Sequence, residues 1–175
     1  MSDTTTTTKP SLKKVRALKA TPANKLRFVI RDDITQYGST TRLDTPEKTE
    51  QFFRQVIMTE ENFEWNKEHV IVALVNTRLM VQGYNVVSVG TVNESSAHPR
   101  EILRPVIMGG AYGFILFHQH PSGDPSPSRS DETMTRRMVE AANLMQIRFL
   151  DHIIVGLPRL GCASYYSFRE SGLIP

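Results

Sequence analysis

The sequence predicts an α/β fold in which a mixed β-sheet is packed between helices. Two largely apolar runs, at 69–76 and 113–118, indicate buried strands, and the first of them is rich in β-branched residues. Segments with apolar residues three and four positions apart alternate with the strands and predict amphipathic helices. A chain of 175 residues is long enough for one domain with a substantial core and a tail.

The predicted elements follow in order as a strand at 26–30, a loop at 32–44, a helix opening at 45–47, the strand at 69–76, one or two strands within 79–92, a helix opening at 98, the strand at 113–118, a helix at 130–145, a strand at 147–155 and a short strand at 163–168. Thr45 suits a helix N-cap and Pro46 the first helical position. Pro105 is expected to disturb the second helix, and Asp151-His152 to interrupt the strand at 147–155. The buried helix faces are predicted to comprise Phe52, Phe53, Val56, Ile57, Ile102, Leu103, Val106, Ile107, Met134, Met138, Ala141, Ala142 and Met145.

The N-terminal residues differ in character from the rest. Residues 1–24 hold a threonine run and few large apolar side chains, which predicts a disordered basic arm before a domain at 25–175. Residues 1–31 carry eight basic side chains and one acidic, a net charge of +7, whereas the remainder carries 13 basic and 17 acidic, a net charge of −4. The arm is either a solvated tail or a weak contact site for nucleic acid.

Several classes of protein are excluded by composition. No apolar run approaches the length of a membrane span, and the start has no apolar core of a secretory signal, so no membrane partner is expected. Cys162 is the only cysteine, which rules out an internal disulfide and multi-cysteine zinc sites. We therefore expect a cytoplasmic protein. The sequence is silent on oligomeric state.

The chemistry is concentrated in residues 117–131, FHQHPSGDPSPSRSD. Alternate residues of a strand point the same way, so His118 and His120 can aim both imidazoles into one volume. Asp131 follows in the first turn of the next helix, where the helix dipole favours a carboxylate. Two histidines and a carboxylate are a common zinc ligand set with one open position. Zinc lowers the pKa of water in such a position to about 7.

Each part of this stretch also has a purely structural interpretation. Ser128 and Asp131 are spaced as a helix capping box, or Ser130 could be the N-cap instead. A histidine near a strand end is often only a polar terminal residue, and the Pro and Gly residues can simply shape a turn. The combination is more specific than its parts, because a loop tip has no structural need for two histidines facing an aspartate.

The spacing His118-x-His120, seven residues, Ser128, two residues, Asp131 resembles the JAMM motif of MPN/JAB-domain metalloproteases. The segments HQHPSGDPSPSRSD, GTVNESSAHPREI and LDHIIVG resemble more closely the RadC family of JAB-domain proteins, over 25–175. This resemblance implies a cytidine-deaminase-like JAB/MPN fold. It implies zinc (Zn2+) bound by His118, His120 and Asp131, with Ser128 stabilising the oxyanion of the tetrahedral intermediate.

Enzymes with this motif also use an upstream glutamate as general acid and base. Two candidates are present. Glu68 directly precedes the buried strand at 69–76, the place that the resemblance implies for this residue. Glu101 lies in the HPRE segment and is explained more simply as an acidic residue in a first helical turn. Glu68 is therefore preferred, and Glu101 remains the alternative.

The expected function is a zinc-dependent metallopeptidase or isopeptidase that hydrolyses an amide bond in a protein or peptide. The alternative is a DNA-repair-associated or DNA-binding accessory protein that uses the basic arm, although the helix–hairpin–helix region of longer RadC proteins has no counterpart here. A zinc deaminase is disfavoured because Pro-Cys-x-x-Cys is missing, and a helical zincin because His-Glu-x-x-His is missing. Gln119 stands where asparagine is usual in the RadC branch and is expected to face away from the metal.

Overall fold

The computed structural model describes residues 41–175 except 62, 91–96 and 159–162. The predicted arm at 1–24, the predicted strand at 26–30, most of the loop at 32–44 and Cys162 lie outside the described residues. The elements are helix α2 (Pro46–Phe52), π-helical turn η1 (Phe53–Ile57), strands β1 (Glu68–Val75) and β2 (Val81–Gly90), helix α3 (Pro99–Met108), strand β3 (Gly113–Gln119), helix α4 (Arg129–Leu144), and strands β4 (Arg148–Val155) and β5 (Tyr165–Ser167). None of the helices in the described part combines the length and apolar character needed to cross a bilayer.

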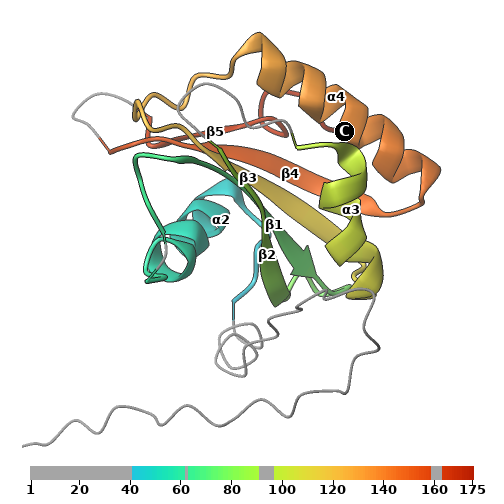
Figure 1. Cartoon of the computed structure of the whole chain (residues 1–175). Coiled ribbons are helices and arrows are strands. Elements are labelled where there is room, and N and C mark those ends of the chain that lie inside the picture. The colour runs from blue at the N-terminus through green and yellow to red at the C-terminus, as the bar shows by residue number, and fades with distance from the viewer. Residues whose placement is uncertain (1–40, 62, 91–96, 159–162) are drawn as a thin grey trace, which may run out of the picture.

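The strands form one mixed sheet in the order β2-β1-β3-β4-β5. Strand β1 pairs antiparallel with both β2 and β3, β3 pairs parallel with β4, and β5 pairs antiparallel with β4. Helices α3 and α4 cover one face of the sheet and α2 covers the other (Figure 1). The predicted α/β fold, a mixed sheet between helices, is therefore confirmed.

The two central strands are buried on both faces, and their side chains alternate between two cores. On the α2 side the core contains Leu43, Phe52, Phe53, Ile57, Ile71, Ala73, Val75, Val81, Ile115, Phe117, Ile153 and Val155. On the α3 and α4 side it contains Val70, Val72, Leu74, Ile102, Leu103, Val106, Phe114, Leu116, Met138 and Ala142. Even-numbered residues of β1 and β3 therefore face α3 and α4, and odd-numbered residues face α2.

Local signals in the sequence misled in three places. Helix α3 runs unbroken through Pro105, because Val106, Ile102 and Leu103 are all held in the core and Gly109 N–H still bonds to the Pro105 carbonyl. Strand β4 continues through the Asp151-His152 pair, and the irregularity is a bulge at Leu150. The predicted burial of Ile107 and Met145 is wrong, since both lie at the last turns of their helices and are about half exposed.

Asp151 satisfies polar groups where β4 meets β5. Its Oδ1 accepts hydrogen bonds from the backbone N–H groups of His152 (2.7 Å) and Arg169 (3.0 Å), and its Oδ2 from the hydroxyl of Ser167 (2.7 Å). Burial raises the pKa of Asp151 to about 6 and outweighs these three donors, each of which favours the charged form. Asp151 thus has a structural role at this edge of the sheet.

The loop between β3 and α4 rests on the end of β4. Gly156 leaves room for this contact, because a Cβ there would lie 2.6 Å from the carbonyl oxygen of Gly123 and 2.7 Å from Cδ of Pro125. Gly123 has a φ of +79°, which favours glycine. From η1, the guanidinium of Arg54 donates to the Gly156 carbonyl at 2.8 Å. The segment that follows His120 therefore packs against Gly156, whose carbonyl is held by Arg54.

The raised pKa of Asp151 predicts a pH-dependent stability. Between its ordinary value of 3.8 and about 6 the folded protein retains a proton that the unfolded chain releases, so this group's contribution is full below pH ~4 and is lost as the pH rises through 6. The loss amounts to at most roughly 3 kcal/mol. Asn at this position still accepts two N–H bonds and can donate to Ser167, so Asp151→Asn should remove this component. Urea unfolding of both proteins at pH 4 and pH 7 measures it, and parallel pH profiles would contradict the assignment.

The close contact at Gly156 predicts that Gly156→Ala destabilises the protein by about 1–3 kcal/mol, because backbone atoms rather than a flexible side chain must move. Gly83→Ala in β2 is the matched control, since its Cβ would meet nothing within 4 Å. The control should change the free energy of unfolding by less than about 0.5 kcal/mol. Thermal and urea unfolding report both values. Equal effects of the two substitutions would argue against a tight loop contact.

Candidate metal centre

The paired strands bring Glu68 and two histidines together at one end of the sheet. His118 lies opposite Val70 in the β1–β3 ladder, and Glu68 is two residues before Val70, so both side chains are on the α4 side. The imidazole Nε2 of His118 contacts the Glu68 carboxylate. His120 follows directly after β3. One ligand atom from each of Glu68, His118 and His120 lies within 4.8 Å of the other two.

Asp131 lies against the same histidines from the first turn of α4. Its Oδ1 is 3.0 Å from His118 Nδ1, and its Oδ2 is 3.5 Å from His120 Nε2. The same Oδ2 accepts hydrogen bonds from the backbone N–H (2.8 Å) and the hydroxyl (2.6 Å) of Ser128, which is the N-cap of the helix. The capping box and the contact with the histidines therefore coexist in one carboxylate, and the alternative cap at Ser130 is not used.

Charge at the site is nearly all buried. His118 and Asp131 are each only 4% exposed at the side chain, whereas Glu68 and His120 are 14% and 17% exposed. Burial alone would lower the pKa of His118, but the carboxylates of Asp131 and Glu68 raise it to about 9. Burial alone would raise the pKa of Asp131, but the two histidines in contact with its carboxylate hold it well below its usual range. The carboxylates of Glu68 and Asp131 thus favour a positive charge at this site.

These residues fit a divalent metal ion. His120 Nδ1 must donate to the carbonyl oxygen of Asp124, 2.8 Å away, which leaves Nε2 with its lone pair toward the cluster. His118 Nδ1 is buried and has no hydrogen-bond partner in the described structure, because its contact with Asp131 lacks hydrogen-bond geometry. Two imidazoles and a carboxylate within 4.8 Å are a donor set that zinc and similar ions prefer.

The other sequence candidates lie elsewhere. Glu101 is on the surface of α3, where it pairs with Arg104 at 3.1 Å and with Arg100 at 3.3 Å. Gln119 is buried on the α2 side, where its amide donates to the Trp65 carbonyl at 2.8 Å. Gln119 therefore faces away from the cluster, as its place in the strand predicts.

A second layer behind the cluster has little signal in the sequence. His152 of β4 is fully buried, and its ring lies 6.1 Å from that of His118 at an angle of 21°. Its Nδ1 contacts the hydroxyl of Thr135 on α4. Burial lowers the pKa of His152 to about 3, so its ring is neutral. The Asp151-His152 pair is noticeable in the sequence, but nothing there indicates Thr135 as its partner.

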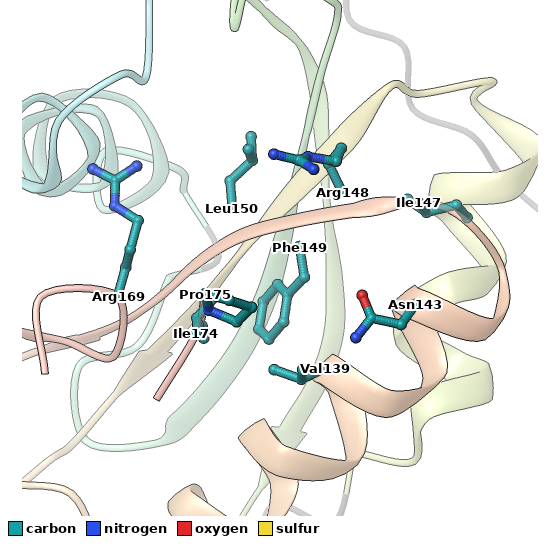
Figure 2. A pocket seen from close by; sticks show the side chains of 9 residues that line it. All are labelled: Val139, Asn143, Ile147, Arg148, Phe149, Leu150, Arg169, Ile174 and Pro175. Carbon is teal, nitrogen blue, oxygen red and sulfur yellow. The ribbon is translucent and has the colours of Figure 1, made fainter. Parts of the chain in front are cut away.

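A cavity of about 170 Å³ lies at the opposite end of β4 from this cluster. Figure 2 shows Phe149 projecting from β4 toward α4, with Arg148 and Arg169 at the edges of the cavity. Arg148 pairs with Gly113 at the start of β3, whereas His118 is near the end of that strand. The cavity therefore contains no part of the candidate metal centre.

Comparison with known proteins gives consistent matches. The family model described as RadC-like JAB domain matches residues 43–173. A UPF0758 protein of Caldanaerobacter subterraneus is 40% identical over 116 residues, which cover 65% of this chain and 50% of that protein. A UPF0758 protein of Thermotoga maritima is 39% identical over 131 residues, which cover 75% of this chain and 54% of that protein. A UPF0758 protein of Symbiobacterium thermophilum is 45% identical over 106 residues, which cover 61% and 42%.

The chain thus spans about half the length of the curated relatives that it matches. The family match includes every residue of the cluster, from Glu68 to Asp131, and the paired strands β1 and β3 that position it. Since the match covers most of the 175 residues, the chain belongs to the RadC-like JAB domain family.

Proposed function

We propose that the protein is a zinc-dependent hydrolase of amide bonds, of the metallopeptidase or isopeptidase type, acting on a protein or peptide. The observation that carries this proposal is the convergence of Glu68, His118 and His120 within 4.8 Å, with Asp131 in contact with both histidines. Family membership supports the class of chemistry, whereas the names of the relatives specify no substrate.

Four residues could hold the metal or assist it, and their surroundings divide the roles. Asp131 is almost fully buried and fixed by Ser128, which suits a ligand that must keep one position. Glu68 is more exposed, which suits a group that must meet water and substrate. We therefore assign metal binding to His118, His120 and Asp131 and proton transfer to Glu68. When bound, zinc would supply a water molecule of lowered pKa and a positive charge that polarises the scissile carbonyl.

The proton transfer requires a carboxylate that can accept and then return a proton. Glu68 accepts a proton from the attacking water on a carboxylate oxygen, and then gives it to the departing amine nitrogen. The hydroxyl of Ser128 donates to Asp131 Oδ2 at 2.6 Å in this structure. To stabilise an oxyanion it must turn that proton toward the substrate. The backbone N–H of Ser128 then continues to hold Asp131.

Metal content is the direct test of the site. The purified full chain should hold about one zinc ion, and Asp131→Ala should reduce this content at least tenfold, because a ligand and the fixed geometry of the histidines are both lost. Glu132→Ala is the matched control, since the neighbouring Glu132 is exposed and its side chain pairs with Arg136 at 3.7 Å. Elemental analysis after dialysis measures all three proteins. Wild-type protein that binds no divalent metal, or an Asp131→Ala variant that retains it fully, would contradict the proposal.

Activity distinguishes the two candidate bases. Glu68→Gln should retain zinc yet lower cleavage by about 10²–10⁴-fold, because an amide cannot accept and return the proton. Glu101→Gln should cleave at the wild-type rate, since Glu101 pairs with Arg104 on the surface of α3. Cleavage of a denatured protein mixture, followed by mass spectrometry with and without a chelator, measures the rates. Full activity in Glu68→Gln would overturn the assignment of the base.

A further inference from the structure

A buried chain of hydrogen bonds connects β4 to the first turn of α4. Thr135 and His152 are both fully buried. The hydroxyl oxygen of Thr135 lies 2.6 Å from the carbonyl oxygen of Asp131 and 2.7 Å from Nδ1 of His152. The chain therefore leads from the strand beside β3 to the residue whose carboxylate contacts His118 and His120.

The direction of these hydrogen bonds follows from the acceptor at one end. A carbonyl oxygen only accepts, so the single hydroxyl hydrogen of Thr135 points to Asp131. The hydroxyl oxygen must then accept from His152, which places the imidazole hydrogen on Nδ1. His152 Nε2 consequently carries a lone pair, and this atom is buried without a hydrogen-bond partner in the described structure.

Two other rings lie nearly parallel to that of His152. Phe168 stacks on it with ring centroids 4.7 Å apart and an angle of 12°. The centroid of the His118 ring lies 6.1 Å from that of His152, at an interplanar angle of 21°. The buried imidazole of His152 thus contacts Thr135, the residue bonded to the Asp131 carbonyl, through its Nδ1. Its ring also lies nearly parallel to that of His118.

We propose that His152 and Thr135 are positioning residues of the metal centre, which fix the first turn of α4 relative to the histidine pair. This inference rests on the proposed function, because it presumes that the cluster binds a metal. Helix α4 is already capped by Ser128 and Asp131, so its N-terminus does not need the link. A neutral histidine with an unpaired buried nitrogen is also costlier than an apolar residue of similar size. A purely structural role does not explain why an unpaired buried nitrogen is retained at this position. Alignment of Asp131 with the two histidines does explain it.

The test uses the full chain in two matched pairs of variants. Thr135→Val removes the hydroxyl at nearly constant shape, and Thr135→Ser restores it. His152→Gln places an amide nitrogen near the ring's Nε2 position, and His152→Asn places it near Nδ1. For each protein, chelator competition gives the dissociation constant for Zn2+, the visible spectrum of bound Co2+ reports ligand geometry, and thermal unfolding reports stability.

Thr135→Val and His152→Gln should each raise the Zn2+ dissociation constant about tenfold or more and shift the Co2+ bands. Thr135→Ser and His152→Asn should stay within about threefold of wild type, with its spectrum. Variants that lose stability yet keep wild-type affinity and spectrum would overturn the positioning role while leaving the proposed function intact. Equal affinities of His152→Asn and His152→Gln would also overturn it, and this pair remains informative if Thr135→Val does not fold. A wild-type chain that binds neither ion overturns both proposals.

Discussion

The antiparallel register between β1 and β3 is the constraint on which the candidate metal centre depends. Val70 is opposite His118, and Glu68 is two residues further along β1, so Glu68 and His118 share a face of the sheet. Because side chains alternate, a shift of one residue would turn Glu68 toward α2. The register is fixed by two apolar cores, each of which accepts every second side chain of both strands. Hydrophobic packing along the whole length of both strands thus positions the side chains of Glu68 and His118.

The cost of this arrangement is electrostatic. Two carboxylates and two imidazoles meet where little water reaches them, and such charges are stable only when they compensate one another. The carboxylates of Asp131 and Glu68 raise the pKa of His118 to about 9, so a proton on this imidazole can provide part of the balance. A divalent cation would replace that proton, because an imidazole must be neutral to act as a ligand. Without a compensating positive charge, the same groups that suit a metal would therefore destabilise the fold.

The period-two pattern of the strands predicts the strand part of this site, whereas Glu68 is assigned from the family resemblance. The pattern predicted two buried strands, the shared direction of His118 and His120, and the opposite direction of Gln119. Pro105 and the Asp151-His152 pair were misread because a local signal for disruption was outweighed by burial of the surrounding residues. The partnership of His152 with Thr135 had no sequence signal, since it joins residues 17 positions apart on different elements. Periodicity reports which way a side chain points, but not what it meets there.

The four residues nearest the centre differ in how firmly they are held, and this difference determines how a substrate can reach them. His118 is in β3, the middle strand of the sheet, and Asp131 is fixed by Ser128. Each is 4% exposed at the side chain. Glu68 at the first residue of β1 and His120 just after β3 are 14% and 17% exposed. An approaching carbonyl must therefore come across the side formed by Glu68 and His120. Glu68 is the more exposed of the two carboxylates, whereas Asp131 is almost fully buried beside the histidines. The two carboxylates thus differ in exposure, although both contact the same imidazole. This difference supports the proposed division of roles between a metal ligand and a base.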